Sequence, residues 1–128
     1  MFSRKDNDPL ILSIDKERRS SFRVEPSPEK PIYVSIGRDK YRVNNIGAGG
    51  IGIYRRDEDK ELESGKRYPF KVTLPLINEV VSGIIRIADI NDTSYHCRFI
   101  ALKKEEKEKI HLFVLERQNE ELREKRKE

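Results

Sequence analysis

The chain has 128 residues, of which 35% are hydrophobic and 39% charged, and its formal net charge is +4. This length predicts one domain with short appendages, and such a domain buries roughly two-thirds of its unfolded surface, enough for a core without disulfides. The single cysteine excludes a disulfide framework, and no segment approaches the roughly 20 apolar residues of a membrane-spanning helix. We therefore expect a cytoplasmic protein with no membrane span.

The positive charge is spread along the chain. Residues 1–25 carry six Lys and Arg against five Asp and Glu, residues 26–102 twelve against ten, and residues 103–128 nine against eight. These differences of +1, +2 and +1 sum to the net +4 and form no concentrated basic stripe of the kind that binds a nucleic-acid polymer. An anionic partner is therefore expected to be small and to be bound by a few arginines.

Residues 1–17 form a polar lead-in segment, apart from the apolar stretch Leu10 to Ile14. The next residues are rich in arginine, in the order Arg18-Arg19-Ser20-Ser21-Phe22-Arg23, and three prolines follow at Pro26, Pro28 and Pro31. Because these prolines forbid a helix and delay any central strand, the arginines are expected to lie on an arm that precedes the folded domain.

Short strands are predicted between residues 32 and 101, because apolar residues recur there at every second position. The alternating sets are Ile32, Val34 and Ile36; Tyr41 and Val43; Ile51 and Ile53; Val72, Leu74 and Leu76; Val81, Gly83, Ile85 and Ile87; and Tyr95, Cys97, Phe99 and Ala101. No helical crossover separates them, which favours an antiparallel sheet or small β-barrel over residues 18–102, including the arm. Cys97 is then expected to be a buried structural thiol.

Residues 103–128 predict one long α-helix, since they contain no Pro or Gly and are rich in Lys, Glu, Leu and Arg. Ile110 and Phe113, with the stem of Arg117, form an apolar face that should dock on the barrel. A second stripe continues with Leu112, Leu115, Asn119 and Leu122, which is too short for a coiled coil. We expect a monomer or weak dimer that tolerates truncation after Gln118; an oligomerisation helix is the alternative.

Motifs for catalysis and for metal binding are missing from the sequence. His96 and His111 are the only histidines, and with one cysteine they give no zinc-ligand spacing. The acidic run at residues 57–59 lacks the glycine and glutamate of a calcium loop, and neither a nucleophile elbow nor a phosphate-binding Gly-Lys-Ser/Thr loop is present. We therefore expect neither an enzyme nor a cofactor.

The arginine arm has the chemistry to bind an anion. Guanidinium groups bind phosphate through two hydrogen bonds and stack on flat bases, which a lysine does not do. On a helix, Arg19 and Arg23 would be neighbours and repel each other, whereas on an extended arm they can surround a ligand. A solvated linker is the alternative interpretation of the same residues.

A second unusual segment, Asn45-Ile46-Gly47-Ala48-Gly49-Gly50, lies between two predicted strands. Three glycines in four residues weaken a strand and suit a backbone that bulges or approaches a ligand closely. Asn and Gly are also the usual residues of a hairpin turn, which remains the alternative.

The two segments together, in this order, resemble the motifs of the PilZ family: an Arg-Arg-x-x-x-Arg arm followed by (Asp/Asn)-x-Ser-x-x-Gly. Arg18, Arg19 and Arg23 match the first motif, while Asn45 and Gly50 match the second, which departs at Gly47, where serine is usual. The resemblance covers roughly residues 17–118 and includes Arg98-Phe99 and the following helix.

The resemblance implies a six-stranded antiparallel barrel with a C-terminal helix and cyclic di-GMP as ligand. By analogy, Arg19 and Arg23 would grip phosphates and guanine edges, and Asn45, Gly47 and Gly50 would line the barrel side. An arginine at the place of Arg18 accompanies binding of an intercalated ligand dimer in this family.

The leading functional hypothesis is a cyclic di-GMP receptor that changes conformation and signals to a protein partner in motility, biofilm or secretion control. The second is a PilZ-like adapter that binds proteins without nucleotide, which the Gly47 departure favours. A single-stranded RNA binder is a third, but it would need aromatics interleaved with basic residues on one strand face.

Overall fold

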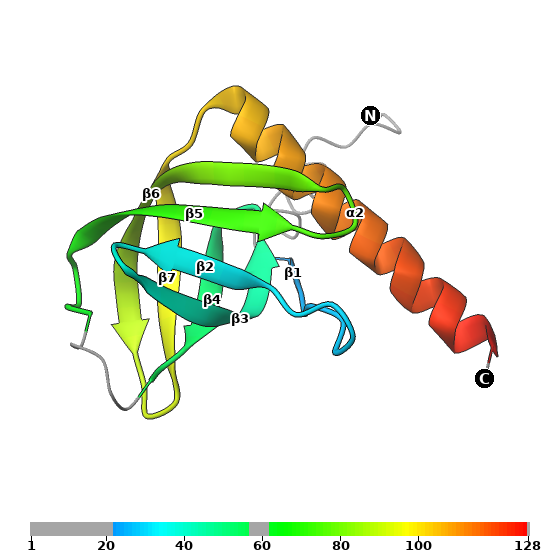
Figure 1. Cartoon of the computed structure of the whole chain (residues 1–128), viewed down its shortest axis with the longest axis horizontal. Coiled ribbons are helices and arrows are strands. Elements are labelled where there is room, and N and C mark those ends of the chain that lie inside the picture. Colours follow the sequence, from blue (N-terminus) through cyan, green and yellow to red (C-terminus); the bar gives the residue numbers. More distant parts are fainter. Residues whose placement is uncertain (1–21, 57–61, 128) are drawn as a thin grey trace, which may run out of the picture.

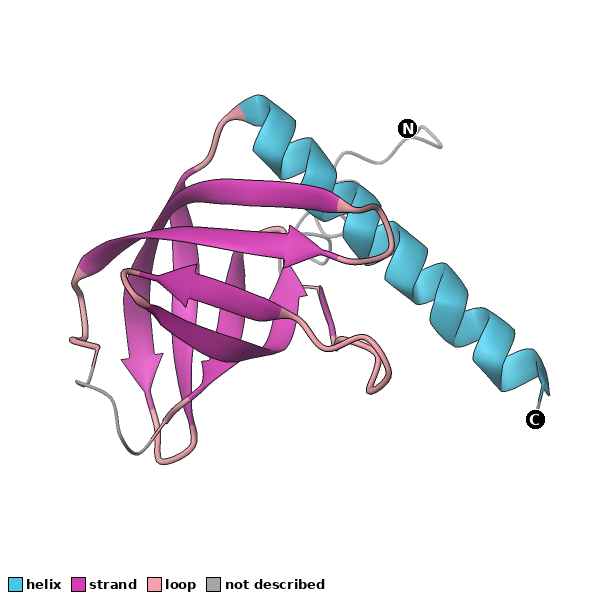
Figure 2. Ribbon diagram, in the orientation of Figure 1, coloured by secondary structure: helices cyan, strands magenta, loops and turns pink. Residues whose placement is uncertain are grey.

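The computed structural model describes residues 22–56 and 62–127, and Figures 1 and 2 show a β-barrel with one long helix packed against it. The strands are β1 (Arg23–Val24), β2 (Tyr33–Ile36), β3 (Asp39–Gly47), β4 (Gly50–Tyr54), β5 (Arg67–Leu74), β6 (Glu79–Ile90) and β7 (Ser94–Ala101). The helix α2 spans Lys104–Lys127.

All neighbouring strands are antiparallel, in the order β1-β3-β2-β5-β6-β7-β4. Strand β3 also pairs with β4, which closes β2 to β7 into a six-stranded barrel and leaves β1 as an extra strand on β3. The mainly β, six-stranded barrel with a C-terminal helix is therefore confirmed.

The barrel interior is filled by the alternating residues that the sequence pattern singled out. In β3, for example, Tyr41 and Val43 are buried while Lys40 and Arg42 point outward. The core consists mostly of branched aliphatic side chains with a few aromatics: Val24, Ile32, Val34, Ile36, Tyr41, Val43, Ile46, Ile51, Ile53, Leu62, Phe70, Val72, Leu74, Val81, Ile85, Ile87, Tyr95, Cys97, Ile110 and Phe113.

Two expected strand patterns differ from the structure. Strand β5 begins at Arg67 and ends at Leu74, so Leu76 lies in the following turn, where the amide of Asn78 donates to the carbonyl of Pro75 over 2.9 Å. At the end of β7, Ala101 is exposed rather than inward, because the pairing of β6 with β7 shifts register between Ile84 and Ile85. Such a bulge turns the residues beyond it away from the core.

Helix α2 packs against β6, β1 and β3. Ile110 and Phe113 are buried against the barrel, as expected from their shared helix face. Leu112, Leu115 and Leu122 are exposed on the other face. Within the described residues, no helix is long and apolar enough to cross a membrane.

The docked part of α2 extends further than the sequence suggested. The Arg117 side chain is 8% exposed; its Nε donates to the carbonyl oxygen of Glu25 over 2.7 Å, and its Nη1 donates to Glu120 over 3.0 Å. Glu120 also lies 3.6 Å from the Nζ of Lys30. Glu120, beyond Gln118, therefore still pairs with a buried arginine that holds the segment after β1, and we expect a truncation after Gln118 to remove this contact.

Candidate ligand-binding site

Strand β1 brings the end of the arginine arm onto the barrel. Arg23 pairs with Gly47 of β3, and Val24 pairs with Ile46. A Cβ atom added at Gly47 would collide with the carbonyl oxygen of Phe22 and lie 2.9 Å from the Cγ of Arg23. Gly47 is not among the positive-φ glycines, so its lack of a side chain serves the close approach of β1 rather than an unusual backbone angle.

The guanidinium of Arg23 lies over the glycine-rich segment. Its Nη1 donates a 2.9 Å hydrogen bond to the Oδ1 of Asn45. Its Nη2 lies 3.0 Å from the place that a Cβ of Gly50 would occupy, and that Cβ would also collide with the carbonyl oxygen of Cys97. The structure thus gathers four of the residues predicted from the sequence, namely Arg23, Asn45, Gly47 and Gly50.

Gly52 belongs to the same arrangement and was missed by the sequence reasoning. It pairs with Asn45 across β3 and β4, and a Cβ there would lie 2.9 Å from the Nδ2 of Asn45. The signal was present in β4, where Gly50 and Gly52 alternate with the buried Ile51 and Ile53. Because Gly50 and Gly52 have no side chains, this part of β4 leaves room for the side chains of Arg23 and Asn45.

The charges at this site are all positive within the described chain. Arg98 pairs with Gly50 across β4 and β7, which places a second guanidinium group on the strand beside it. Partial burial lowers the pKa of Arg23 below its ordinary value, and the nearby Arg98 adds to the lowering. No carboxylate of the described residues forms an ion pair with either arginine. A bound anion would relieve this repulsion.

Cys97 lies beneath the site on the barrel interior. It is buried, and this burial raises the pKa of its thiol to about 12. The thiol therefore stays protonated at physiological pH and is a poor nucleophile, since the thiolate is the reactive form. The expectation of a buried structural cysteine is confirmed.

Two predicted ligand residues, Arg18 and Arg19, lie outside the described residues, and their roles remain predictions. In the described part of the chain, no group of three His, Cys, Asp or Glu side chains is placed to hold a metal ion. The described part of the site consists of the guanidinium groups of Arg23 and Arg98, the side-chain amide of Asn45 and a stretch of backbone without side chains. Such groups suit an anion with flat faces, because arginine pairs with phosphate and stacks on planar rings.

Comparisons with known proteins identify the family and the fold. The family model of the PilZ domain matches residues 17–116. The chain also resembles the PilZ domain of YcgR from Escherichia coli, solved with c-di-GMP, with a TM-score of 0.67 and 17% identity over 84% of this chain and 95% of that chain. No curated protein matches.

Two longer structures share the fold. The inhibitor of motility MotI/DgrA from Bacillus subtilis has a TM-score of 0.66 and 17% identity, covering 77% of this chain and 49% of that one. A complex of YcgR with c-di-GMP has a TM-score of 0.61 and 21% identity, covering 81% of this chain and 48% of that one. The chain therefore spans about half the length of these two relatives. Because the family model covers most of its residues, the chain belongs to the PilZ domain family.

Proposed function

We propose that this chain is a receptor for cyclic di-GMP rather than an enzyme. The observation that carries the proposal is the guanidinium of Arg23, which is held by Asn45 above the bare backbone of Gly50 and has no carboxylate partner in the described chain. Cyclic di-GMP has two phosphates and two flat guanine rings, which match a guanidinium group and a glycine surface. The likeness to YcgR structures that contain c-di-GMP supports this choice of ligand.

Each predicted site residue has a distinct role in this proposal. Arg23 pairs with a phosphate or a guanine edge, and Arg19 does the same from the preceding part of the arm. Asn45 orients Arg23 and offers its amide to the ligand, while the missing side chains at Gly47 and Gly50 let ligand and arm approach the barrel. Arg18 stacks on a guanine of a second, intercalated ligand molecule.

Ligand binding is proposed to change the surface that a partner protein reads. Strand β1 has only two residues, so few backbone hydrogen bonds oppose its displacement. A ligand that engages Arg19 and Arg23 together would fix the arm on the barrel. The altered surface would then signal to a protein in motility, biofilm or secretion control; the relative named as an inhibitor of motility is consistent with the first of these.

Isothermal titration calorimetry with cyclic di-GMP tests this function. We expect saturable binding with a ligand-to-protein ratio of about two, as the intercalated dimer requires, and no binding of the linear dinucleotide pGpG under the same conditions. Because arginine–phosphate contacts are screened by salt, the affinity should fall as ionic strength rises. A titration without binding heat at several temperatures would contradict the receptor proposal.

The second candidate function is an adapter that binds proteins without nucleotide. Gly47 favours it, because the serine hydroxyl usual at this position is missing and the carbonyl of Phe22 crosses the position closely instead. An adapter would bind its partner equally well with and without cyclic di-GMP. The calorimetric titration separates the two functions, since only the receptor gives binding heat with the nucleotide.

A further inference from the structure

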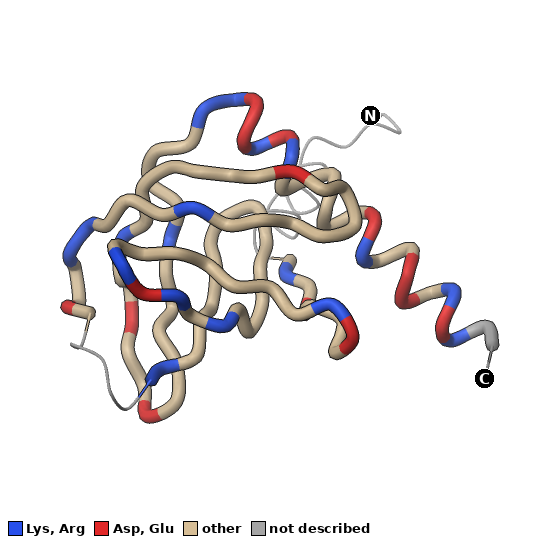
Figure 3. The backbone as a smooth tube through the Cα atoms, viewed as in Figure 1, with Lys and Arg blue, Asp and Glu red and all other residues tan. Residues whose placement is uncertain are grey.

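The barrel has a second cationic surface, which lies on β2, β3 and β5 and uses none of the nucleotide-site residues. Its members are Tyr33, Lys40, Arg42 and Lys71, and we call it the Tyr33 face. Figure 3 shows Lys and Arg positions along the β2–β3 hairpin and in the middle of β5, interrupted by Asp39 at the hairpin turn. All four side chains of the face are exposed, and the Tyr33 side chain is the most prominent apolar group among them at 51% exposure.

Strand register places these four residues next to one another. Ser35 of β2 pairs with Lys40 on one side and with Lys71 on the other, so the two lysines flank it in one row across three strands. Neighbouring strands are about 4.8 Å apart, which puts the two lysine backbones about 10 Å from each other. Tyr33 pairs with Arg42 in the adjacent row of the same outer face.

A groove of about 330 Å³ opens on this face. Lys40 and Lys71 line its sides, Ser35 and Thr73 add hydroxyl groups, and Tyr33 contributes an aromatic surface. Pro31 and Pro75 also line it, just before β2 and just after β5, where their rings restrict the backbone. The groove thus combines a rigid apolar part with two mobile cations.

The cations of the Tyr33 face have no acidic partner among the described residues. Every carboxylate in a described ion pair belongs instead to Glu63, Glu79, Glu106, Glu120 or Glu124. Arg56 lies next to the face and donates to the carbonyl oxygen of Lys40 over 2.7 Å. The face is therefore complementary to an acidic partner.

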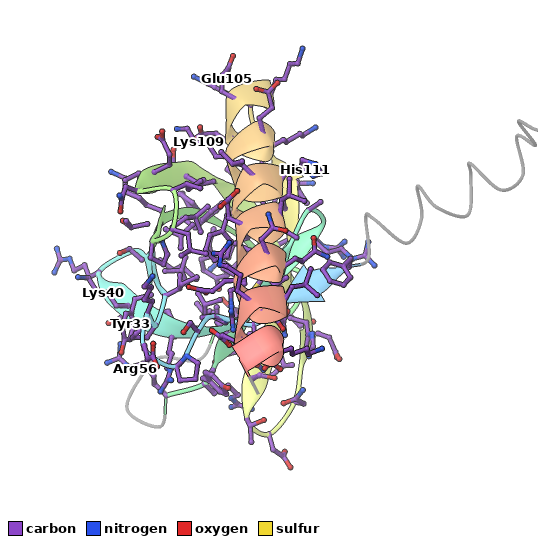
Figure 4. The ribbon with its side chains drawn as sticks, turned by 90° about the vertical axis from the view of Figure 1, so that its right-hand side faces the viewer. Tyr33, Lys40, Arg56, Glu105, Lys109 and His111 are labelled. Atoms are coloured by element: carbon purple, nitrogen blue, oxygen red, sulfur yellow. The ribbon has the colours of Figure 1, made fainter. Side chains whose placement is uncertain are left out.

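The Tyr33 face lies apart from the nucleotide site. In Figure 4, Tyr33, Lys40 and Arg56 lie to one side of α2, whereas the blue ribbon of β1, which carries Arg23, lies to the other. A partner on the Tyr33 face would therefore leave Arg23 accessible.

We propose that the Tyr33 face binds an extended, acidic segment of a partner protein, with an apolar side chain of that segment on the ring of Tyr33 and flanking carboxylates on Lys40 and Lys71. Tyrosine is enriched at the energetic centres of protein interfaces, where the surrounding polar residues exclude water. A single nucleic-acid strand is less suited, because it stacks successive bases on several aromatics. Among the described residues, Tyr33 is the only aromatic one that lines this groove, and its paired neighbour is Arg42.

Fluorescence anisotropy with a labelled Asp-Glu-Phe-Glu-Asp peptide tests the proposal on the full chain. The matched Asn-Gln-Phe-Gln-Asn peptide keeps the apolar residue and removes the charges. We expect at least about tenfold tighter binding of the acidic peptide at low salt, and a loss of this preference as salt rises. Equal binding of the two peptides, or binding of neither, overturns the proposal.

Charge reversal locates the contact. Lys40→Glu combined with Lys71→Glu should weaken acidic-peptide binding by more than about 30-fold, and Tyr33→Ala by about tenfold. Lys107→Glu, an exposed lysine on α2, is the control and should change affinity less than about twofold. Lys40→Arg with Lys71→Arg should retain binding. If the charge-reversal variant binds the peptide as the parent does, the Tyr33 face is not the site.

Two further experiments separate this proposal from the alternatives. A labelled short oligothymidine that binds while the acidic peptide does not would replace the protein partner by a nucleic acid and overturn the proposal. Calorimetry of the charge-reversal variant with cyclic di-GMP should match the parent, since no residue of the nucleotide site is changed. Failure of the nucleotide proposal is therefore visible independently of failure at the Tyr33 face.

Discussion

Strand β3 contributes to both proposed binding surfaces, which differ in the physical means of recognition. Its first half carries Lys40 and Arg42 on the Tyr33 face, where the side chains are long, exposed and charged. Its last residues, Asn45 to Gly47, lie at the proposed nucleotide site, where a side chain at Gly47 would collide with the backbone of Phe22 just before β1. One nine-residue strand therefore passes from a surface made of side chains to a surface made of backbone.

The difference explains which partner fits each surface. A bare backbone held close to one guanidinium group can contact a small flat anion over its whole area, but a substitution has no room there. Flexible lysines around one tyrosine adapt to an extended chain and tolerate exchange for other cations. The nucleotide site should therefore be sensitive to steric change, and the Tyr33 face to change of charge.

Phe113→Ala should damage both surfaces together, because the ring supports the barrel from α2 and is 1% exposed. Removing a buried phenylalanine side chain costs about 3 kcal/mol or more in free energy of unfolding. Urea unfolding followed by circular dichroism measures this value. Leu112→Ala, one position away and 46% exposed, is the control and should change stability by less than about 0.5 kcal/mol. Equal stability of the two variants would mean that α2 is not docked through Phe113.

Arg23→Ala should affect the nucleotide site alone. Hydrogen bonds to charged groups contribute roughly 1.5–3 kcal/mol, so cyclic di-GMP affinity should fall about 10- to 150-fold while the unfolding midpoint stays near that of the parent. Arg42→Ala removes an equal charge on the Tyr33 face and is the matched control in the same calorimetric titration. Parental affinity in Arg23→Ala, or an equal loss in Arg42→Ala, would remove Arg23 from the site.

Gly47→Ser tests the steric argument. Restoring the usual serine would be expected to tighten binding if the position only lacked a hydroxyl group. In this chain the added Cβ meets the carbonyl of Phe22, so we expect a loss of about 1–3 kcal/mol in stability, typical of overpacking, or displacement of β1. Thermal unfolding and the calorimetric titration measure the two effects. Parental stability together with tighter cyclic di-GMP binding would show that β1 does not cross Gly47 in solution.

Two truncations define where the docked part of α2 ends. A chain ending at Glu121 keeps the contact of Arg117 with Glu120 and should lose less than about 0.5 kcal/mol of stability. A chain ending at Gln118 leaves Arg117 without that carboxylate and should lose about 1 kcal/mol or more. Identical unfolding curves would place the boundary at Gln118.

Light scattering of the same proteins reports whether the exposed leucines of α2 hold an oligomer together. A multimer that becomes monomeric on truncation would show that α2 is an oligomerisation helix.

Arg18→Ala should change stoichiometry more than affinity. If Arg18 stacks on a guanine of the second ligand molecule, its loss should lower the ligand-to-protein ratio from about two to about one while stability is unchanged. Calorimetry returns this ratio directly. An unaltered ratio would show that Arg18 does not hold an intercalated dimer.

The barrel and the helix follow from patterns that act over short distances. Alternation in residues 32–36 and 81–87 determines which face of each strand is buried, and the structure agrees. The uninterrupted helix formers after Lys103 predict the helix, which the structure shows as α2. The prediction that Ala101 faces inward at the end of β7 was wrong, because the bulge between β6 and β7 depends on the pairing of two strands. No single-strand pattern contains that information.

The candidate site was predictable in its residues but not in its packing. Arg23, Asn45 and Gly50 emerged from short motifs, whereas the reason for Gly47 depends on Phe22, which lies 25 positions earlier in the chain and crosses it only in the folded structure. Arg98 enters through its pairing with Gly50, and Arg117 through the hydrogen bond that it donates to the carbonyl oxygen of Glu25. Each of these is a tertiary contact that local sequence does not encode.

A two-dimensional NMR titration of the isotope-labelled chain with cyclic di-GMP locates the nucleotide on the barrel directly. The backbone amides of Arg23, Asn45, Gly47, Gly50 and Gly52 should shift most and saturate together, while those of Tyr33 and Lys71 on the Tyr33 face should stay near their original positions. Shifts centred on the Tyr33 face, or spectra unchanged at saturating nucleotide, would contradict the assignment of the glycine-rich surface as the nucleotide site.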